Sequence, residues 1–362
     1  MLRILLLLIA VFEFASPVLF GQVELEQDEE KKNVFVATPV LFRTPETSWG
    51  FGLGGAYNFF WNQDSTNQRP SQILFAATYT LEDQILIHLP FQWFLLQDKI
   101  WIESDLGFYR YVYPYFGIGN ETQIEDKEFF ESTFPRAQLA ALYAIRKHLY
   151  SGLSYKFDNF FITERASDGL LAEEKPTGFE GAVISELAFR SVWDSRDQIY
   201  YPTKGSLVSL DIFGSDPALA STYTYSGFFL DAAKYVSVAK EHILVGHLQW
   251  GMQWGEVPFF QLLALGGPKF HRGYILGRHR DRRLALFQGA YRFPIYWRFK
   301  MEVFGSYGTV SSEDAFPLQN GHWSMGAGLR ILVDKGNGLH LRVDYARGSD
   351  QTGLYLTVGE AF

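Results

Sequence analysis

The strongest constraint on the fold of this chain is a strict alternation of apolar and polar residues, clearest on both sides of a short turn at Glu82 and Asp83. Successive side chains of a β-strand point to opposite faces of the sheet, so this alternation predicts strands with one apolar and one polar face. The apolar face carries Ile73, Phe75, Ala77, Tyr79 and Leu81, then Ile85, Ile87, Leu89, Phe91 and Trp93, and the polar face carries Gln72, Thr78, Thr80, Gln84, His88 and Gln92. Such a pattern is typical of the wall of a transmembrane β-barrel.

The composition supports a membrane protein built from strands. Apolar residues make up 47% of the sequence and aromatic residues 17%, whereas only 20% are charged. Beyond the first residues, no run approaches the ~20 apolar residues that a membrane-spanning helix needs. The pattern therefore favours an all-β, transmembrane antiparallel barrel, with a soluble β-sandwich or a secreted lectin as the alternative. The net charge of −8 argues against a nucleic-acid partner, and the absence of cysteine excludes disulfides and thiolate metal sites.

The first residues resemble an export signal. A basic start at Arg3 precedes an apolar run over 4–12 and a small-residue region near Gly21, which predicts a signal peptide over 1–21. A short acidic leader, 22–33, follows without apolar periodicity and is expected to be periplasmic. The barrel is expected to occupy 34–362, without a separate periplasmic domain before it.

The apolar alternation and the turn residues between segments predict about sixteen strands, an even number as bacterial single-chain barrels prefer. The longer connectors, 112–134, 163–177, 255–283 and 311–321, all follow odd-numbered strands, and most connectors after even-numbered strands are brief. Outer-membrane barrels have longer external loops, so these connectors are expected to be external. The expected strands are 34–43, 48–61, 71–81, 85–93, 100–111, 135–145, 149–162, 178–193, 205–213, 223–236, 242–254, 284–296, 299–310, 322–333, 339–346 and 353–362.

The sixth external connector, 255–283, is called the arginine loop here. Between Arg272 and Arg283 it carries five arginines and one acid, Asp281. Such a charge density cannot face lipid and must lie in water or in a polar lumen. The tip combines glycines that permit unusual backbone angles with basic and aromatic residues: Gly266, Gly267, His271, Arg272, Gly273 and Tyr274.

The chain ends on a predicted strand with an aromatic last residue. Because an open strand edge cannot persist in hydrocarbon, this strand must pair with the first one. Pro39 in the first strand lacks an N–H, so the closing seam is expected to have fewer hydrogen bonds than the other joints. The residues that characterise the last strand are Leu354, Leu356, Val358, Gly359 and Phe362.

Four segments together resemble the BamA/TamA-type outer-membrane assembly superfamily, also described as bacterial surface antigen barrels. The tip of the arginine loop is similar to the family's sixth-loop motif, in which an Arg-Gly-aromatic tip folds into the lumen. The other three segments are 194–205, which resembles the turn before the ninth strand, 291–295, which resembles strand twelve, and 354–362, which resembles the carboxy-terminal assembly signal.

The chain also departs from the family pattern. Ala290 and Ser306 stand where the family usually has the acids that pair with the loop arginine. If Arg272 enters the lumen, it needs other acceptors, because an unpaired buried charge costs several kcal/mol. The family's periplasmic POTRA domains are also expected to be absent. By strand parity, the lumen-facing candidates are Glu103, Asp105, Gln288, Glu302 and Asp344, and the residues alone do not choose among them.

The resemblance implies a role in outer-membrane protein assembly or translocation in the outer membrane of a Gram-negative bacterium. It implies outer-membrane lipid as surroundings, and nascent outer-membrane proteins or a separate periplasmic protein as partners. A passive or gated channel for small solutes is the alternative, and a structural or adhesive surface protein is a third. No H-E-x-x-H or G-x-S-x-G motif is present, so we expect neither an enzyme, nor a metal, nor a cofactor. Arg330, Arg342 and Asp344 are interpreted as a charge-paired network of the lumen wall.

Overall fold

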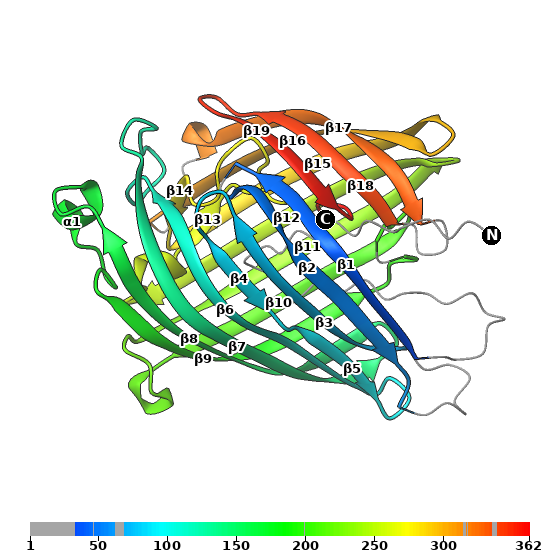
Figure 1. Ribbon diagram of the computed structural model, residues 1–362, viewed down its shortest axis with the longest axis horizontal. Coiled ribbons are helices and arrows are strands. Elements are labelled where there is room, and N and C mark those ends of the chain that lie inside the picture. The colour runs from blue at the N-terminus through cyan, green and yellow to red at the C-terminus, as the bar shows by residue number, and fades with distance from the viewer. Residues whose placement is uncertain are drawn as a thin grey trace.

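The computed structural model is an antiparallel β-barrel with almost no helix, drawn in Figure 1. It describes residues 33–45, 47–61, 69–198, 200–313, 316, 318–334 and 339–362. The predicted signal peptide and nearly all of the predicted leader lie outside these ranges. None of the helices in the described ranges is long and apolar enough to cross a membrane.

Neighbouring strands of the wall follow the order of the chain, and β1 pairs with both β2 and β19, which closes the cylinder. The described residues thus confirm a closed barrel of 16 strands, with β4 and β5 as two parts of one crossing. The wall strands are β1 Val34–Thr44, β2 Ser48–Phe59, β3 Ser71–Thr80, β4 Ile85–His88, β5 Phe91–Leu95, β6 Ile100–Tyr115, β7 Glu128–Arg146, β8 Leu149–Arg165, β9 Gly181–Asp194, β10 Gly205–Ser215, β11 Tyr225–Ala239, β12 His242–Gly255, β15 Arg283–Tyr296, β16 Phe299–Ser311, β17 His322–Asp334, β18 Leu339–Arg347 and β19 Thr352–Val358.

Short elements occupy the connectors. They are α1 Leu170–Glu174, η2 Pro217–Leu219, η3 Phe259–Gln261, β13 Leu263–Leu265, β14 His279–Asp281 and η4 Leu318–Asn320. Within the arginine loop, β13 and β14 pair as a small two-stranded sheet, which was not predicted from the sequence.

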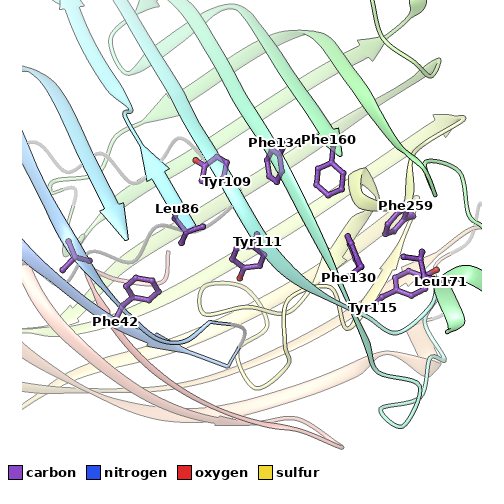
Figure 2. Packing of buried hydrophobic residues seen from close by; sticks show 11 residues of the cluster. Phe42, Leu86, Tyr109, Tyr111, Tyr115, Phe130, Phe134, Phe160, Leu171 and Phe259 are labelled. Carbon is purple, nitrogen blue, oxygen red and sulfur yellow. The ribbon is translucent and has the colours of Figure 1, made fainter. Parts of the chain in front are cut away.

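The predicted alternation corresponds to an exposed and a buried face of each strand. On β7, for example, Leu139 and Tyr143 are exposed, whereas Ala140 and Leu142 between them are buried. One buried face carries an aromatic cluster from β1 through β4, β6 and β7 to β8, where Phe259 and Leu171 of two connectors join it (Figure 2). Apolar side chains on the exposed face are what a strand in hydrocarbon requires.

Several predicted strand boundaries were wrong, most clearly in three regions of the chain. The sequence predicted a connector over 112–134, but β6 continues to Tyr115 and β7 begins at Glu128, because Tyr115 and Phe130 pack on Phe259 of the arginine loop. The predicted strand 85–93 is interrupted between β4 and β5 at Pro90, which has no N–H to donate. The last strand ends at Val358 rather than at the terminus, where Gly359 adopts a φ of +79°.

Candidate functional site

The tip of the arginine loop is a tight turn held by left-handed backbone angles. Gly266 and Gly267 have φ angles of 108° and 101°, and Gly273 has a φ of 110°. The backbone N–H of Gly267 donates to the carbonyl oxygen of Tyr274 at 3.0 Å, which closes the turn. L-residues with a Cβ rarely adopt such angles, so the glycines allow the chain to reverse within a few residues. This reversal presents Arg272 at the end of the loop.

Arg272 is 1% exposed and lies against two acids of the barrel wall. Its guanidinium pairs with Glu302 on β16 at 3.0 Å and also with Asp344 on β18. Both acids are fully buried, on the face opposite exposed Val303 and Tyr345. The Arg272 guanidinium carbon also lies 3.3 Å from the centre of the Phe304 ring, in a cation–π contact.

A larger group of buried charges surrounds this pair and is called the charge cluster here. Glu302 accepts from Arg330 at 2.8 Å and from Arg292 at 2.7 Å, in addition to Arg272. Arg330 also pairs with Asp344 and, at 3.2 Å, with Glu360 after β19. Burying charges is costly unless each is paired, and the arrangement gives every acid at least two arginines. The charge cluster comprises Arg272, Arg292, Arg330, Arg342, Glu302, Asp344 and Glu360.

The backbone of the tip is also bound to the wall. The N–H of Gly273 donates to the Tyr355 hydroxyl at 2.9 Å, and the Ser324 hydroxyl donates to the carbonyl oxygen of Arg272. The Arg342 guanidinium donates to the Pro268 carbonyl oxygen at 3.1 Å. Strands β17, β18 and β19 therefore all hold the tip.

Two histidines of the arginine loop are held in their neutral form. The His271 ring stacks on Tyr274 at 4.6 Å and its Nδ1 lies 3.0 Å from the Ser306 hydroxyl. Burial, and then the neighbouring His322, lower the pKa of His271 to about 3. Burial, followed by the charges of His322 and Arg278, lowers the pKa of His279 to about 2. Neutral imidazoles can pack against aromatic rings without the cost of a buried charge.

Of the five predicted partners of Arg272, two contact its guanidinium and three contact other residues. Glu302 and Asp344 contact it. Gln288 instead accepts a hydrogen bond from the backbone N–H of His271, the residue before Arg272, at 3.1 Å. The other two acids have partners elsewhere on the wall: Glu103 pairs with Arg190 at 2.9 Å, and Asp105 with His88. Ser306, at one of the departures from the family pattern, contacts His271 rather than Arg272.

Connectors of the barrel meet around the arginine loop. Arg278 donates to the Thr122 hydroxyl and carbonyl of the β6–β7 connector and pairs with Asp350 of the β18–β19 connector at 2.8 Å. The N–H of Gly119 donates to the Arg280 carbonyl oxygen at 2.9 Å. A pocket of about 350 Å³ lies at this junction, lined by residues that include Asn120, Arg278, His279, Asn320, His322 and Asp350. In the described part of the chain, no cluster of histidine and acidic residues could hold a metal ion.

The joint between β1 and β19 is much shorter than its neighbours. Within the described residues, Arg43 opposite Leu356 is the single register pair of this seam, whereas β1 pairs with β2 from Val34 to Thr44. The Arg43 guanidinium adds one contact, to the Leu354 carbonyl oxygen at 3.4 Å. Pro39, predicted to weaken the seam, lies on β1 opposite Leu53 of β2.

The end of the chain leaves the sheet. Leu354 is exposed on the outer face of β19, and Leu356 packs against the aromatic cluster, while the side chain of Val358 lies outside the described part. Beyond Gly359, Glu360 pairs with Arg330, and the Phe362 ring stacks on His247 of β12 at 4.9 Å. This turn was not predicted from the sequence, although Gly359 and the acid Glu360 interrupt the apolar alternation there.

The connector between β9 and β10, over 195–204, is stabilised by two acids. Arg196 donates to both carboxylate oxygens of Asp194, at 2.9 and 2.8 Å. Asp197 accepts from the backbone N–H groups of Thr203 and Lys204, at 2.9 and 3.1 Å. Burial alone would raise the pKa of Asp197, but these hydrogen bonds outweigh it and lower the pKa. The motif thus has a structural role in the turn.

Three solved structures superpose on most of this chain. BamA from Haemophilus ducreyi, in a form lacking POTRA domains 1–3, superposes with a TM-score of 0.61 over 91% of this chain and 70% of that one, at 12% sequence identity. CdiB from Acinetobacter baumannii gives 0.54 at 12% identity, over 91% of this chain and 60% of its own. CdiB from Escherichia coli gives 0.55 at 9% identity, over 90% and 62%.

At these identities the likeness shows the fold alone, and the chain spans 60 to 62% of the length of the CdiB chains. Among curated proteins, none matches the chain by sequence. The Omp85 superfamily domain, however, matches residues 147–362, which is more than half of the sequence and includes the arginine loop, the charge cluster and the last strand. The resemblance to BamA-type barrels is therefore confirmed, and this chain belongs to the Omp85 superfamily.

Proposed function

We propose that this chain is an outer-membrane barrel that assembles or translocates proteins, acting through the joint between β1 and β19. The observation that carries the proposal is the short seam, with Arg43 opposite Leu356 as its single described register pair. An unpaired strand edge is a template for another strand. Opening this seam would offer the edge of β1 to a nascent outer-membrane protein, which is the partner class we propose. We assign no enzymatic activity to the barrel.

The arginine loop is proposed to fill the lumen as a plug. Its support is the pairing of Arg272 with Glu302 and Asp344, together with the backbone contacts of the tip to β17 and β19. A tip held by that many charged contacts is costly to withdraw without new partners. With the plug in place, a substrate would leave through the seam rather than along the barrel axis.

A passive or gated channel for small solutes is the second candidate. It is favoured by buried ion pairs that contain no residue of the arginine loop, such as Arg136 with Asp158 at 2.7 Å and Arg190 with Asp211 at 2.9 Å. Charged inner walls are common in porins, which conduct through a water-filled lumen. This candidate requires an open axis and no movement of the seam.

A disulfide across the seam tests the leading proposal. The chain contains no cysteine, so Arg43→Cys with Leu356→Cys introduces the only thiols. The matched control, Leu41→Cys with Phe51→Cys, locks the fully paired β1–β2 joint instead. The readout is the insertion of an unfolded barrel protein into liposomes that contain the purified chain.

Oxidation of the seam pair should reduce insertion to the level of empty liposomes, and a reductant should restore it, while the control pair inserts equally in both states. Equal insertion with the seam locked and unlocked would contradict the proposal. A reduced barrel that never exceeds empty liposomes would contradict unaided insertion by this chain.

A further inference from the structure

Four connectors of the barrel enclose the pocket beside the arginine loop. Its lining comes from the β6–β7, β16–β17 and β18–β19 connectors and from Arg278 and His279 of the arginine loop. Its volume of about 350 Å³ lies near the lower end of the ~300–1,000 Å³ that small-molecule sites occupy. Neither the acids that pair with Arg272 nor the paired residues of the seam line this pocket. The pocket therefore has chemistry of its own.

His322, which lines the pocket, has a ring nitrogen that can accept a hydrogen bond. Its Nε2 lies 2.8 Å from the carbonyl oxygen of Asn120, and a carbonyl oxygen only accepts, so Nε2 carries the proton. At pH 7 an imidazole with the ordinary pKa of ~6.5 is mostly neutral, so Nδ1 of His322 has a lone pair. None of the hydrogen bonds among the described residues uses this Nδ1, which is open to solvent.

Two carboxylates of the lining add further acceptors. Asp350 pairs with Arg278 through one oxygen at 2.8 Å, and Glu121 accepts from the Asn320 amide through one oxygen at 3.1 Å. In the part of the chain that the structure describes, the second oxygen of each carboxylate has no hydrogen-bond donor. The amide nitrogen of Gln123 donates to the Glu121 carbonyl oxygen at 3.0 Å, which leaves its amide oxygen as another acceptor. The remaining capacity of the lining is therefore mainly for hydrogen-bond donors.

These acceptors are spread along the pocket and do not converge on one point. Among the described residues, no three histidine or acidic side chains come together closely enough to hold a metal ion, so one cation could not satisfy them. One face of the His322 ring is covered by His279, with the ring centres 3.6 Å apart, so that face is not available for stacking. A matching ligand carries several separated donors, as a saccharide does, because each hydroxyl group donates at a different point of the sugar ring.

We propose that this pocket binds a saccharide, whose hydroxyl groups donate to His322, Asp350 and Glu121. The proposal rests on the proposed outer-membrane location, with the long connectors facing the cell exterior. Saccharides occur there as the polar part of outer-leaflet lipids and as released polysaccharide, and both sources carry the same hydroxyl chemistry. Because Arg278 and His279 belong to the lining, a bound saccharide also holds the arginine loop against the other three connectors.

Binding to the full chain in detergent micelles, measured by calorimetry, tests the proposal with three probes. They are the lipopolysaccharide of the native host, the polysaccharide that mild acid releases from it, and the lipid part that remains. The whole molecule should bind, and the lipid part should not. Binding of the released polysaccharide as well would identify the sugar alone as the ligand, whereas binding of the whole molecule only would assign the lipid-linked form. Equal binding of the lipid part and the whole molecule would overturn the proposal, as would no binding of either sugar-bearing probe.

A matched pair of variants tests whether the sugar occupies this pocket. Glu121→Gln keeps the oxygen that accepts from Asn320 and removes the charged acceptor, so the saccharide should bind about tenfold more weakly. The control is Glu125→Gln, at an exposed acid of the same connector that does not line the pocket, and it should bind like the parent. Equal affinities of the two variants would place the sugar elsewhere and overturn the site.

The contact with the arginine loop has its own measurement. A ligand that binds only the docked loop stabilises it by mass action, so the saccharide should slow protease cleavage within 266–281 in the parent chain. At the same concentration it should protect Glu121→Gln less. A saccharide that binds without slowing cleavage would contradict the part that the loop plays in the site.

Saccharide binding and the proposed function fail separately. Binding in micelles needs neither a client protein nor movement of the seam, so unchanged insertion by the seam-locked barrel would contradict the proposed function and leave the saccharide site intact. Conversely, a barrel that binds no saccharide would still lose insertion when its seam is locked.

Discussion

The guanidinium of Arg272 lies 3.0 Å from the carboxylate of Glu302, and both side chains are almost completely buried. Replacing Arg272 by alanine removes one of three guanidinium groups from Glu302 and one of three from Asp344. Breaking a buried ion pair typically costs about 3–5 kcal/mol. We expect Arg272→Ala to lower the free energy of unfolding by about 3 kcal/mol, measured by urea titration in lipid vesicles. Arg282→Ala, which removes an exposed arginine ten residues later, should cost little. Equal losses would mean that the tip is not docked.

The tip should also be sensitive to a single methyl group at Gly273. The φ of Gly273 is 110°, and a Cβ there would lie 3.0 Å from the backbone of Arg347 and Gly348. Strain of this kind costs about 1–3 kcal/mol. We expect Gly273→Ala to loosen the loop, seen as faster protease cleavage within 266–281. Gly246→Ala, where a Cβ meets no atom within 4 Å, is the control and should leave cleavage unchanged.

Acid should weaken the docked loop before it protonates the carboxylates. The folded pKa values of His271 and His279, about 3 and 2, lie below the ~6.5 of an exposed histidine. When folding lowers the pKa of a histidine, the resulting stabilisation is fully present above the pKa of the unfolded state. It is lost as the pH falls below that pKa. We expect the unfolding temperature to fall between pH 7 and pH 5.

The double variant His271→Asn with His279→Asn should flatten this dependence, and His148→Asn, which removes an imidazole outside the loop, should preserve it. If the unfolding temperature of the double variant falls as steeply as that of the parent, the two histidines do not titrate on unfolding.

The connector between β9 and β10 depends on one carboxylate. Asp197 accepts two backbone hydrogen bonds and one from the Thr203 hydroxyl. Asp197 is exposed, so we expect Asp197→Ala to cost only about 1 kcal/mol, and Asp197→Asn, which keeps an acceptor oxygen, to cost less. Hydrogen bonding lowers the pKa of Asp197 in the folded protein. The stabilisation by its carboxylate is therefore fully present above the pKa of the unfolded state, ~4, and is lost as the pH falls through the pKa of the folded state. Urea titrations of both variants at pH 7 and at pH 3 should show a smaller difference at pH 3 than at pH 7.

The barrel was predictable because its physical requirement repeats along the chain. Each strand must present apolar side chains to hydrocarbon, so the alternation at Ile85 or Leu139 indicates a strand without knowledge of its neighbours. The predicted strand ends were wrong where a strand is extended by packing inside the barrel and not by apolar alternation. Tyr115 and Phe130 extend β6 and β7 because a loop more than a hundred residues away covers them.

The site was predictable only in part, for the same reason. Strand parity placed Glu302 and Asp344 on the inner wall, but it placed Glu103 and Asp105 there as well. Strand parity predicts on which face of the wall a side chain lies, but not how far along the barrel axis or where around the barrel. It therefore could not distinguish the acids near Arg272 from the acids that pair with Arg190 and His88. The inward turn after Val358 depends on Arg292 and Arg330, far away in sequence.

Single-channel conductance in planar bilayers tests most directly whether the arginine loop closes the barrel. A closed barrel would leave the joint between β1 and β19 as the route for a substrate. The intact chain should be silent or show only brief openings, and a variant lacking 266–281 should form a large, steady pore. Shortening the β10–β11 connector at η2 Pro217–Leu219, which has no buried residue, is the control and should leave the barrel closed. A large, steady pore in the intact chain would contradict the account and favour a passive channel.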